Sequence, residues 1–265
     1  ITNGVQRVVV NQMHRSPGVF FDHDKGKSHA SGKLLFNCRV IPNRGSWLDL
    51  EYDVKDFLYF KIDRKKKIFV STLLMALGFT KPEIADEFYG KENYSFDVKS
   101  GKWKTKFNPE NYKAKNFSEE VIDNKTGDVV IKLGDKVNYL TAKKLANDGL
   151  KEILVSQESL YGKYLHRDIK VSDEEEGTFA IGTELNDTII KQILDSNISS
   201  IEISTTNSIN KGPYLLTTLL NDKNNNKDEA ITEVYKVLRP GEPPTVEIAT
   251  QIFNNLFFSS DRSDL

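Results

Sequence analysis

Residues 7–21 read Arg7-Val-Val-Val-Asn-Gln-Met-His-Arg-Ser-Pro-Gly-Val-Phe-Phe21. The stretch joins an apolar run, a polar and basic turn and a Pro-Gly corner. Three successive β-branched residues, Val8 to Val10, predict a strand that packs in a sheet, and Pro17-Gly18 predicts the turn that follows. The N-terminal part of the chain is therefore expected to be rich in β-structure.

Composition excludes several classes of protein. The 265 residues are enough for two domains of ordinary size. The 37 basic and 38 acidic residues nearly balance, so any surface that binds nucleic acid has to be a local patch. The single cysteine, Cys38, excludes an internal disulfide framework and a cysteine zinc cluster. No apolar run is long enough to span a membrane and no signal-peptide pattern opens the chain, so the sequence predicts a cytoplasmic protein without a membrane partner. Because the first residue is Ile1 rather than methionine, we expect a piece of a longer protein.

Local patterns predict an α+β fold. Helices are expected from Ser71 to Leu77 and after Thr80, which forms a capping box with Glu83. Towards the C-terminus, Asp228 and Thr245 are expected to cap two amphipathic helices. Short apolar runs separated by turn residues predict strands before residue 64, at 8–10, 34–36, 40–41 and 57–60.

After Tyr89 the composition changes to lysine, asparagine and aspartate with isolated aromatic residues. Residues 90–98 and 101–107 predict hairpin strands, and 142–155 and 189–203 each predict a helix, a turn and a strand. These two units lie about 48 residues apart. Their similarity comes either from internal duplication or from chance. We expect the aromatic residues Tyr94, Trp103 and Tyr112 of this region to be exposed.

Irregular motifs in a fixed order make the chain resemble the bacterial RNA polymerase β subunit. Two of them are Ile41-Pro-Asn-Arg-Gly-Ser-Trp-Leu-Asp49 and Leu238-Arg-Pro-Gly-Glu-Pro-Pro-Thr245. The other matching motifs are residues 7–21, 26–32, 61–67, 74–78, 212–214 and 255–258.

This resemblance implies a domain organisation and a function. Residues 1–88 and 208–265 would form the β lobe, a discontinuous domain of mixed β-sheet and short helices. Residues 89–207 would form an inserted α+β domain of the lineage-specific kind. The lobe would form a wall of the downstream DNA channel and contact downstream duplex and the non-template strand during transcription. Nucleotidyl transfer would belong to the whole polymerase, whose catalytic Mg²⁺ is held by another subunit, so no cofactor is expected in this chain. The implied partners are DNA and the β′, α and sigma subunits.

Trp47 follows a turn between two predicted strands. The residue could pack in a core or rim, or its indole could stack on an unpaired base, a contact worth roughly 1–3 kcal/mol. The resemblance favours stacking, because the family's tryptophan at this motif stacks on a non-template base at the downstream edge of the transcription bubble.

Arg15 lies where a strand meets a turn, and it could bind guanine or phosphate or donate to buried carbonyl groups. The resemblance assigns it to the pocket that receives a non-template guanine, with His14 supporting the loop. The run Arg64-Lys65-Lys66-Lys67 could be a solvated face or could neutralise backbone phosphates. The resemblance places this run near the downstream fork and therefore favours DNA contact.

Other candidate sites have less support. The resemblance implies that Val10 and Gln12 lie beside the rifamycin pocket, although Val10 could equally be an ordinary strand residue. The four histidines, His14, His23, His29 and His166, could be combined with Asp22 and Asp24 as metal ligands, and the adjacent His23 and Asp24 come closest to such a site. An exposed turn has the same composition. Ser16 lacks a nucleophile elbow, and residues 173–176 predict an exposed acidic loop. No catalytic or metal-binding residues are therefore predicted. The alternative function is a protein-interaction module, in which the inserted domain docks transcription regulators.

Overall fold

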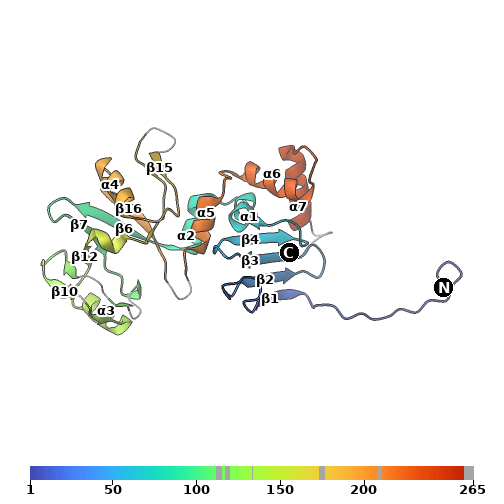
Figure 1. Cartoon of the computed structure of the whole chain (residues 1–265), viewed down its shortest axis with the longest axis horizontal. Helices are drawn as coiled ribbons and strands as arrows, with labels where there is room; N and C mark the ends of the chain where they lie inside the picture. The colour runs from blue at the N-terminus through green and yellow to red at the C-terminus, as the bar shows by residue number, and fades with distance from the viewer. Residues whose placement is uncertain (112–114, 117–119, 133, 173–176, 208–210, 260–265) are drawn as a thin grey trace. The chain divides into compact units, whose positions relative to one another are not determined.

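The computed structural model describes residues 1–111, 115–116, 120–132, 134–172, 177–207 and 211–259 (Figure 1). The chain divides into two compact units. Unit 1 consists of Ile1–Leu73 and Asp228–Leu265, and unit 2 consists of Leu74–Lys227. Both ends of the chain thus belong to one unit. The domain division at 88/89 and 207/208 stays a prediction. None of the described helices combines the length and the apolar character needed to cross a membrane.

Unit 1 is built on a five-stranded antiparallel sheet in the order β1-β2-β3-β4-β5, of which Figure 1 labels β1 to β4. The chain adds each strand beside the previous one, so every connection in the sheet joins neighbours. The strands are β1 (Gly18–His23), β2 (Phe36–Ile41), β3 (Leu48–Tyr52), β4 (Leu58–Ile62) and β5 (Ile68–Phe69).

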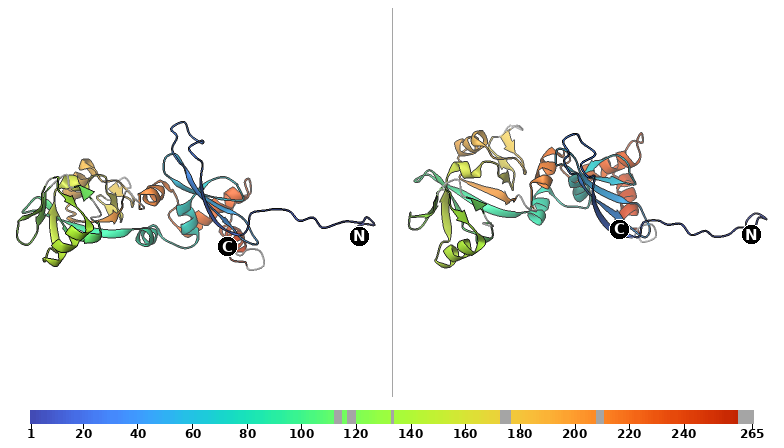
Figure 2. Two further views of the ribbon diagram at one scale, coloured as in Figure 1. Left: turned by 90° about the horizontal axis from the view of Figure 1, so that it is seen from below. Right: turned by 60° about the horizontal axis from the view of Figure 1, so that its bottom comes forward.

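The two faces of this sheet differ in polarity because side chains alternate along each strand. Phe60 and Ile62 of β4 are buried, whereas Tyr59 and Lys61 point to the other face and are partly exposed. The unit is completed by α1 (Val70–Ala76), within which the unit boundary falls, and by α6 (Lys227–Leu238) and α7 (Val246–Phe257) (Figure 2). The buried core residues of α6 and α7 are Ala230, Ile231, Val234, Tyr235, Ala249 and Phe253.

The predicted strand at Val8–Val10 was wrong. The side chains of Val8, Val9 and Val10 are 87%, 94% and 76% exposed, and no strand within the described part of the chain pairs with them. A strand needs a neighbour for its backbone N–H and C=O groups. Because the sheet begins at Gly18, the β-branched composition of residues 8–10 is not enough to form one.

Unit 2 contains a seven-stranded antiparallel sheet in the order β10-β9-β12-β7-β6-β16-β13, of which Figure 1 labels β10, β12, β7, β6 and β16. Its strands are β6 (Gly90–Asp97), β7 (Lys102–Lys106), β9 (Val121–Asp123), β10 (Val129–Ile131), β12 (Glu152–Val155), β13 (Tyr164–Leu165) and β16 (Ser200–Thr205). Two small two-stranded sheets pair β8 (Lys115–Asn116) with β11 (Lys136–Val137) and β14 (Ile169–Lys170) with β15 (Thr178–Phe179). The helices are α2 (Lys81–Phe88), α3 (Tyr139–Asn147), α4 (Asp187–Asp195) and α5 (Tyr214–Asn221), and two 3-10 turns are η1 (Pro109–Asn111) and η2 (Gln157–Leu160).

Several local predictions are confirmed, including the α+β fold class. Thr80 caps α2 with a complete capping box involving Glu83, and β6 pairs with β7 as the expected hairpin. Both helix–turn–strand units are present, as α3 with β12 and α4 with β16. Thr245 is the N-cap residue of α7, but its side chain donates or accepts no capping hydrogen bond. Asp228 was predicted to cap a helix and instead lies in the first turn of α6.

The expected exposure of two aromatic residues in unit 2 was wrong. Tyr94 is 3% exposed and Trp103 is 0% exposed, and both belong to the core of the seven-stranded sheet. The lysines of β7 alternate with Trp103 and Thr105, so the charged residues occupy one face and leave the other for the core. Tyr112 lies outside the described residues. The regulator-docking function stays a prediction, and these two residues give it no exposed surface.

Candidate nucleic-acid interface

The strand register of unit 1 brings the predicted DNA-binding residues to one end of its sheet. Gly18, at the start of β1, lies opposite Ile41 at the end of β2. Leu48, at the start of β3, lies opposite Val40 of β2 and Ile62 at the end of β4. Three features of the sequence therefore meet at this end: Arg15 before β1, Trp47 before β3 and the basic run 64–67 after β4.

Trp47 is partly exposed and lies within cation–π distance of two arginine side chains. The guanidinium carbon of Arg39 is 5.5 Å from the centre of the indole, and that of Arg64 is 5.7 Å from it. Each exposed cation–π contact is worth about 0.5–1 kcal/mol. The indole is thus a partly exposed flat ring with two guanidinium groups close to it.

Asp63 fixes the backbone around Trp47. Its carboxylate accepts hydrogen bonds from the Trp47 N–H at 2.9 Å and from the Ser46 hydroxyl at 2.6 Å. Its own N–H donates to the Trp47 carbonyl oxygen at 3.0 Å. Asp63 and Arg64 have φ angles of 47° and 60°, and the Lys65 N–H donates to the Ile62 carbonyl at 2.9 Å, as in a tight hairpin turn. The Asp63 side chain therefore connects Trp47 to the basic run 64–67.

Arg39 is held in place by Asp49, which is 8% exposed. The Nε and Nη2 atoms of Arg39 lie 2.5 Å and 3.4 Å from the two carboxylate oxygens of Asp49. The hydrogen bond to Asp49 is the main cause that raises the pKa of Arg39. A paired guanidinium in this setting keeps its charge and has little rotational freedom.

The four cations of the basic run differ in how they are engaged. Lys65 donates to the Leu238 carbonyl oxygen at the end of α6, at 2.9 Å. Lys67 forms an ion pair with Glu51 at 2.7 Å, and Lys61 contacts the other oxygen of Glu51 at 2.8 Å.

Burial acts to raise the pKa of Glu51, but the hydrogen bonds from the two lysines outweigh it and lower that pKa. The positive charge of Lys67 is therefore partly neutralised. The side chains of Arg64 and Lys66 are exposed, and within the described part of the chain neither contacts a carboxylate. Arg64 and Lys66 are the members of the run best placed to meet a phosphate.

Arg15 lies near the same end of the sheet, where it contacts Phe20. The guanidinium carbon of Arg15 lies 5.9 Å from the centre of the Phe20 ring, and Phe20 is the cross-strand partner of Arg39. The preceding His14 contacts the Arg15 carbonyl oxygen through Nδ1 at 2.6 Å. Gln12, like Val10, is exposed in the segment before β1, and their relation to an antibiotic pocket stays a prediction.

The histidine and aspartate residues near the first turn have structural partners. The Asp24 carboxylate accepts hydrogen bonds from the N–H groups of Gly26 and Leu35, at 3.0 Å and 2.9 Å. Those bonds, led by the one from Leu35, lower the pKa of Asp24. His23 accepts from the Lys25 N–H at 3.0 Å. Among the described residues, no group of three or more His, Cys, Asp or Glu side chains is placed to hold a metal ion. Residues 173–176 lie outside the described part.

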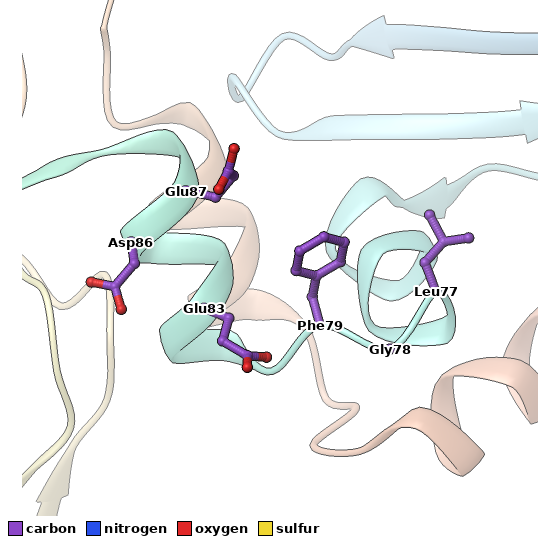
Figure 3. A pocket seen from close by; sticks show the side chains of 6 residues that line it. All are labelled: Leu77, Gly78, Phe79, Glu83, Asp86 and Glu87. Atoms are coloured by element: carbon purple, nitrogen blue, oxygen red, sulfur yellow. The ribbon is translucent and has the colours of Figure 1, made fainter.

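Unit 2 has a hollow beside α2 that is lined by carboxylates and apolar side chains (Figure 3). Two of its three carboxylates already have partners: Glu83 belongs to the capping box of α2, and Asp86 pairs with Arg167 at 2.6 Å. Asp86 also contacts Nε2 of the fully buried His166 at 2.9 Å, while Nδ1 of that ring contacts the Ser204 hydroxyl at 2.8 Å. Ser204 is 3% exposed and a nucleophile needs access to substrate, so this chain of hydrogen bonds links α2 to β16 and is not a catalytic triad. The residues lining the hollow are Leu77, Gly78, Phe79, Glu83, Asp86 and Glu87.

Two residues of the candidate interface, Arg39 and Asp63, were missed from the sequence. Arg39 lies within β2, directly before the predicted strand at 40–41, and Asp63 directly follows β4. Arg39 lies opposite Asp49, and that pairing follows from the strand register rather than from either segment. For Asp63, the only local signal was its position directly before the basic run.

Comparison with known proteins gives the family. Residues 15–160 match the family model described as RNA polymerase Rpb2, domain 2. Over all 265 residues the chain is 47% identical to the DNA-directed RNA polymerase subunit beta of Rhizobium leguminosarum bv. trifolii. It is 45% identical over the same length to the proteins of that name from Rickettsia felis and Rickettsia conorii. In each case the chain spans 19% of the relative's length. The match confirms the resemblance seen in the sequence motifs, and the chain belongs to the RNA polymerase Rpb2 domain 2 family as it occurs in bacterial β subunits.

Proposed function

We propose that the chain acts as the lobe of a bacterial DNA-directed RNA polymerase, where it contacts downstream duplex and the non-template strand during transcription. Nucleotidyl transfer then belongs to the assembled enzyme, with Mg²⁺ bound by another subunit. The partners are DNA and the β′, α and sigma subunits. The observation that carries this proposal is the accessible Trp47 indole, with Arg15, Arg64 and Lys66 at the same end of the sheet.

Each part of this surface suits a different part of a DNA fork. Aromatic side chains stack on unpaired bases whatever the sequence, because every base has a π-face. The exposed cations suit phosphates, and each phosphate contact adds to the salt dependence of binding. The combination therefore favours a junction of duplex and single strand over duplex alone.

The proposal is tested with polymerase reconstituted from a β subunit that contains this chain. Two forks are compared, which differ only in whether the unpaired non-template position carries a base or an abasic site. We expect Trp47→Ala to weaken binding of the fork with the base by roughly 5- to 150-fold, the equivalent of about 1–3 kcal/mol, with little effect on the abasic fork. Trp47→Phe, which keeps an aromatic ring, is the matched control and should retain most of the difference.

Lys66→Ala tests the phosphate contact separately. It should weaken both forks equally and reduce the slope of log affinity against log salt by about 0.7–0.9, the value for one phosphate. Equal losses on both forks for Trp47→Ala would refute base stacking. An unchanged salt slope for Lys66→Ala would refute the phosphate contact.

A further inference from the structure

The two arginines on Trp47 are held very differently. Arg39 lies within a strand, and both oxygens of the nearly buried Asp49 carboxylate engage its guanidinium. Arg64 lies in a tight turn with a φ of 60°, is exposed, and contacts no carboxylate within the described part of the chain. Its contact with the indole is the one interaction of its guanidinium that the described residues provide.

An arriving base would have to share the indole with these two cations. Stacking of a base on an aromatic side chain is worth more than an exposed cation–π contact. Displacing Arg39 would also break a largely buried ion pair and leave the Asp49 carboxylate without its partner, which is strongly unfavourable. Displacing Arg64 breaks only the ring contact. An arriving base can therefore displace Arg64 from the indole at low cost, whereas displacing Arg39 is costly.

We propose that Arg39 is a positioning residue that fixes the Trp47 indole for the unpaired base, and that Arg64 leaves the ring when the base stacks. This inference rests on the proposed function, since it assigns roles within the same base-stacking site. The released Arg64 guanidinium is then free for a phosphate of the same strand. Asp49 acts through Arg39 and has no contact with the DNA.

The test uses the two forks described above, in the same reconstituted polymerase. The unpaired base is 2-aminopurine, a fluorescent adenine analogue that is quenched when it stacks. Arg39→Lys keeps the charge and an ion pair with Asp49 but loses the planar guanidinium. We expect it to lower the affinity ratio between the base and abasic forks by roughly 3- to 10-fold, a part of the full stacking effect. Quenching at saturating protein should fall, and the salt slope should not change.

Arg64→Ala should behave in the opposite way. The affinity ratio should stay equal to the wild-type ratio or rise, because the base no longer competes with a cation for the ring. The salt slope should fall by about one phosphate contact. Lys66→Ala serves as the matched control, with a lower salt slope and an unchanged ratio.

Each contrary result identifies what has failed. If Trp47→Ala leaves the affinity ratio unchanged, the proposed function itself is refuted. If Trp47→Ala abolishes the ratio while Arg39→Lys keeps both ratio and quenching, the positioning role is refuted and the proposed function stands. A lower salt slope in Arg39→Gln, which removes the charge, would make Arg39 a phosphate ligand and overturn the inference. A reduced ratio in Arg64→Ala would show that Arg64 supports stacking and does not exchange with the base. Quenching is read at saturation, so a variant that binds weakly still gives a decisive result.

Discussion

Replacing Asp63 tests which interactions stabilise the turn next to Trp47. Its carboxylate accepts two hydrogen bonds, from the Trp47 N–H and the Ser46 hydroxyl, and its backbone is left-handed with a φ of 47°. Asp63→Ala removes both hydrogen bonds and places a residue without a polar side chain in a left-handed conformation. Asp63→Gly removes the same bonds without that backbone cost, and Asp63→Asn keeps an acceptor oxygen and tolerates the backbone.

The three substitutions should differ in a definite order. Two exposed hydrogen bonds contribute about 1–2 kcal/mol together, and the left-handed conformation costs alanine about another 1 kcal/mol. Asp63→Ala should therefore lower the free energy of unfolding by about 2–3 kcal/mol. Glycine recovers about 0.5–1 kcal/mol of this, after its greater loss of backbone entropy on folding. Asp63→Asn should cost about 1 kcal/mol or less, because asparagine keeps one acceptor oxygen.

Urea unfolding followed by Trp47 fluorescence measures these differences. The chain has two tryptophans, and the other one, Trp103, is fully buried in unit 2. A Trp103→Phe background therefore makes the signal specific for unit 1. Stability is taken from the midpoint at constant slope, because a changed slope would indicate a change in the denatured state or a loss of two-state behaviour.

Two results would refute this reasoning. If Asp63→Gly is no more stable than Asp63→Ala, the left-handed backbone carries no cost. If Asp63→Asn is as damaging as Asp63→Ala, the hydrogen bonds to the carboxylate are not what stabilises the turn.

Two further predictions concern unit 2. The hydrogen bonds from Arg167 and His166 lower the pKa of Asp86 from 3.8 to about 2, so ionised Asp86 stabilises the fold fully above pH 3.8, and this stabilisation is lost as the pH falls through about 2. The difference in free energy of unfolding between wild type and Asp86→Asn should thus be constant above pH 5 and shrink on acidification; a difference that persists at pH 2 would contradict it. A Cβ on Gly182 would lie 2.3 Å from the Leu216 carbonyl oxygen at a φ of 86°, so Gly182→Ala should cost about 2 kcal/mol or more in thermal or urea unfolding. Wild-type stability in that variant would show that the two segments move apart freely.

Features that depend on a few consecutive residues were predictable from the sequence. The capping box of α2 joins Thr80 and Glu83, which are three residues apart, and the β6–β7 hairpin joins strands separated by a short turn. The two helix–turn–strand units were found for the same reason. The basic run and Trp47 were also visible in the sequence, because each follows directly from composition and neighbouring turn residues.

The sequence alone could not determine burial or the pairing of distant residues. Val8–Val10 and Trp103 show this in opposite directions, since the apolar run is exposed and the aromatic residue within a lysine-rich segment is fully buried. Burial depends on whether another part of the chain covers the residue, which local composition does not encode.

What the sequence determined by itself was the family and the residue types of the proposed interface: an arginine before the first strand, a tryptophan in a turn and a basic run. Only the tertiary structure decided that they form one surface. The register of β1 to β4 brings three turns to the same end of the sheet, and cross-strand pairing places Arg39 between Asp49 and Phe20. Strand register depends on contacts between distant segments, and a shift of one residue would reverse the face of every side chain. For that reason the arrangement of Trp47 with the paired Arg39 and the exposed Arg64 exists only in the folded sheet.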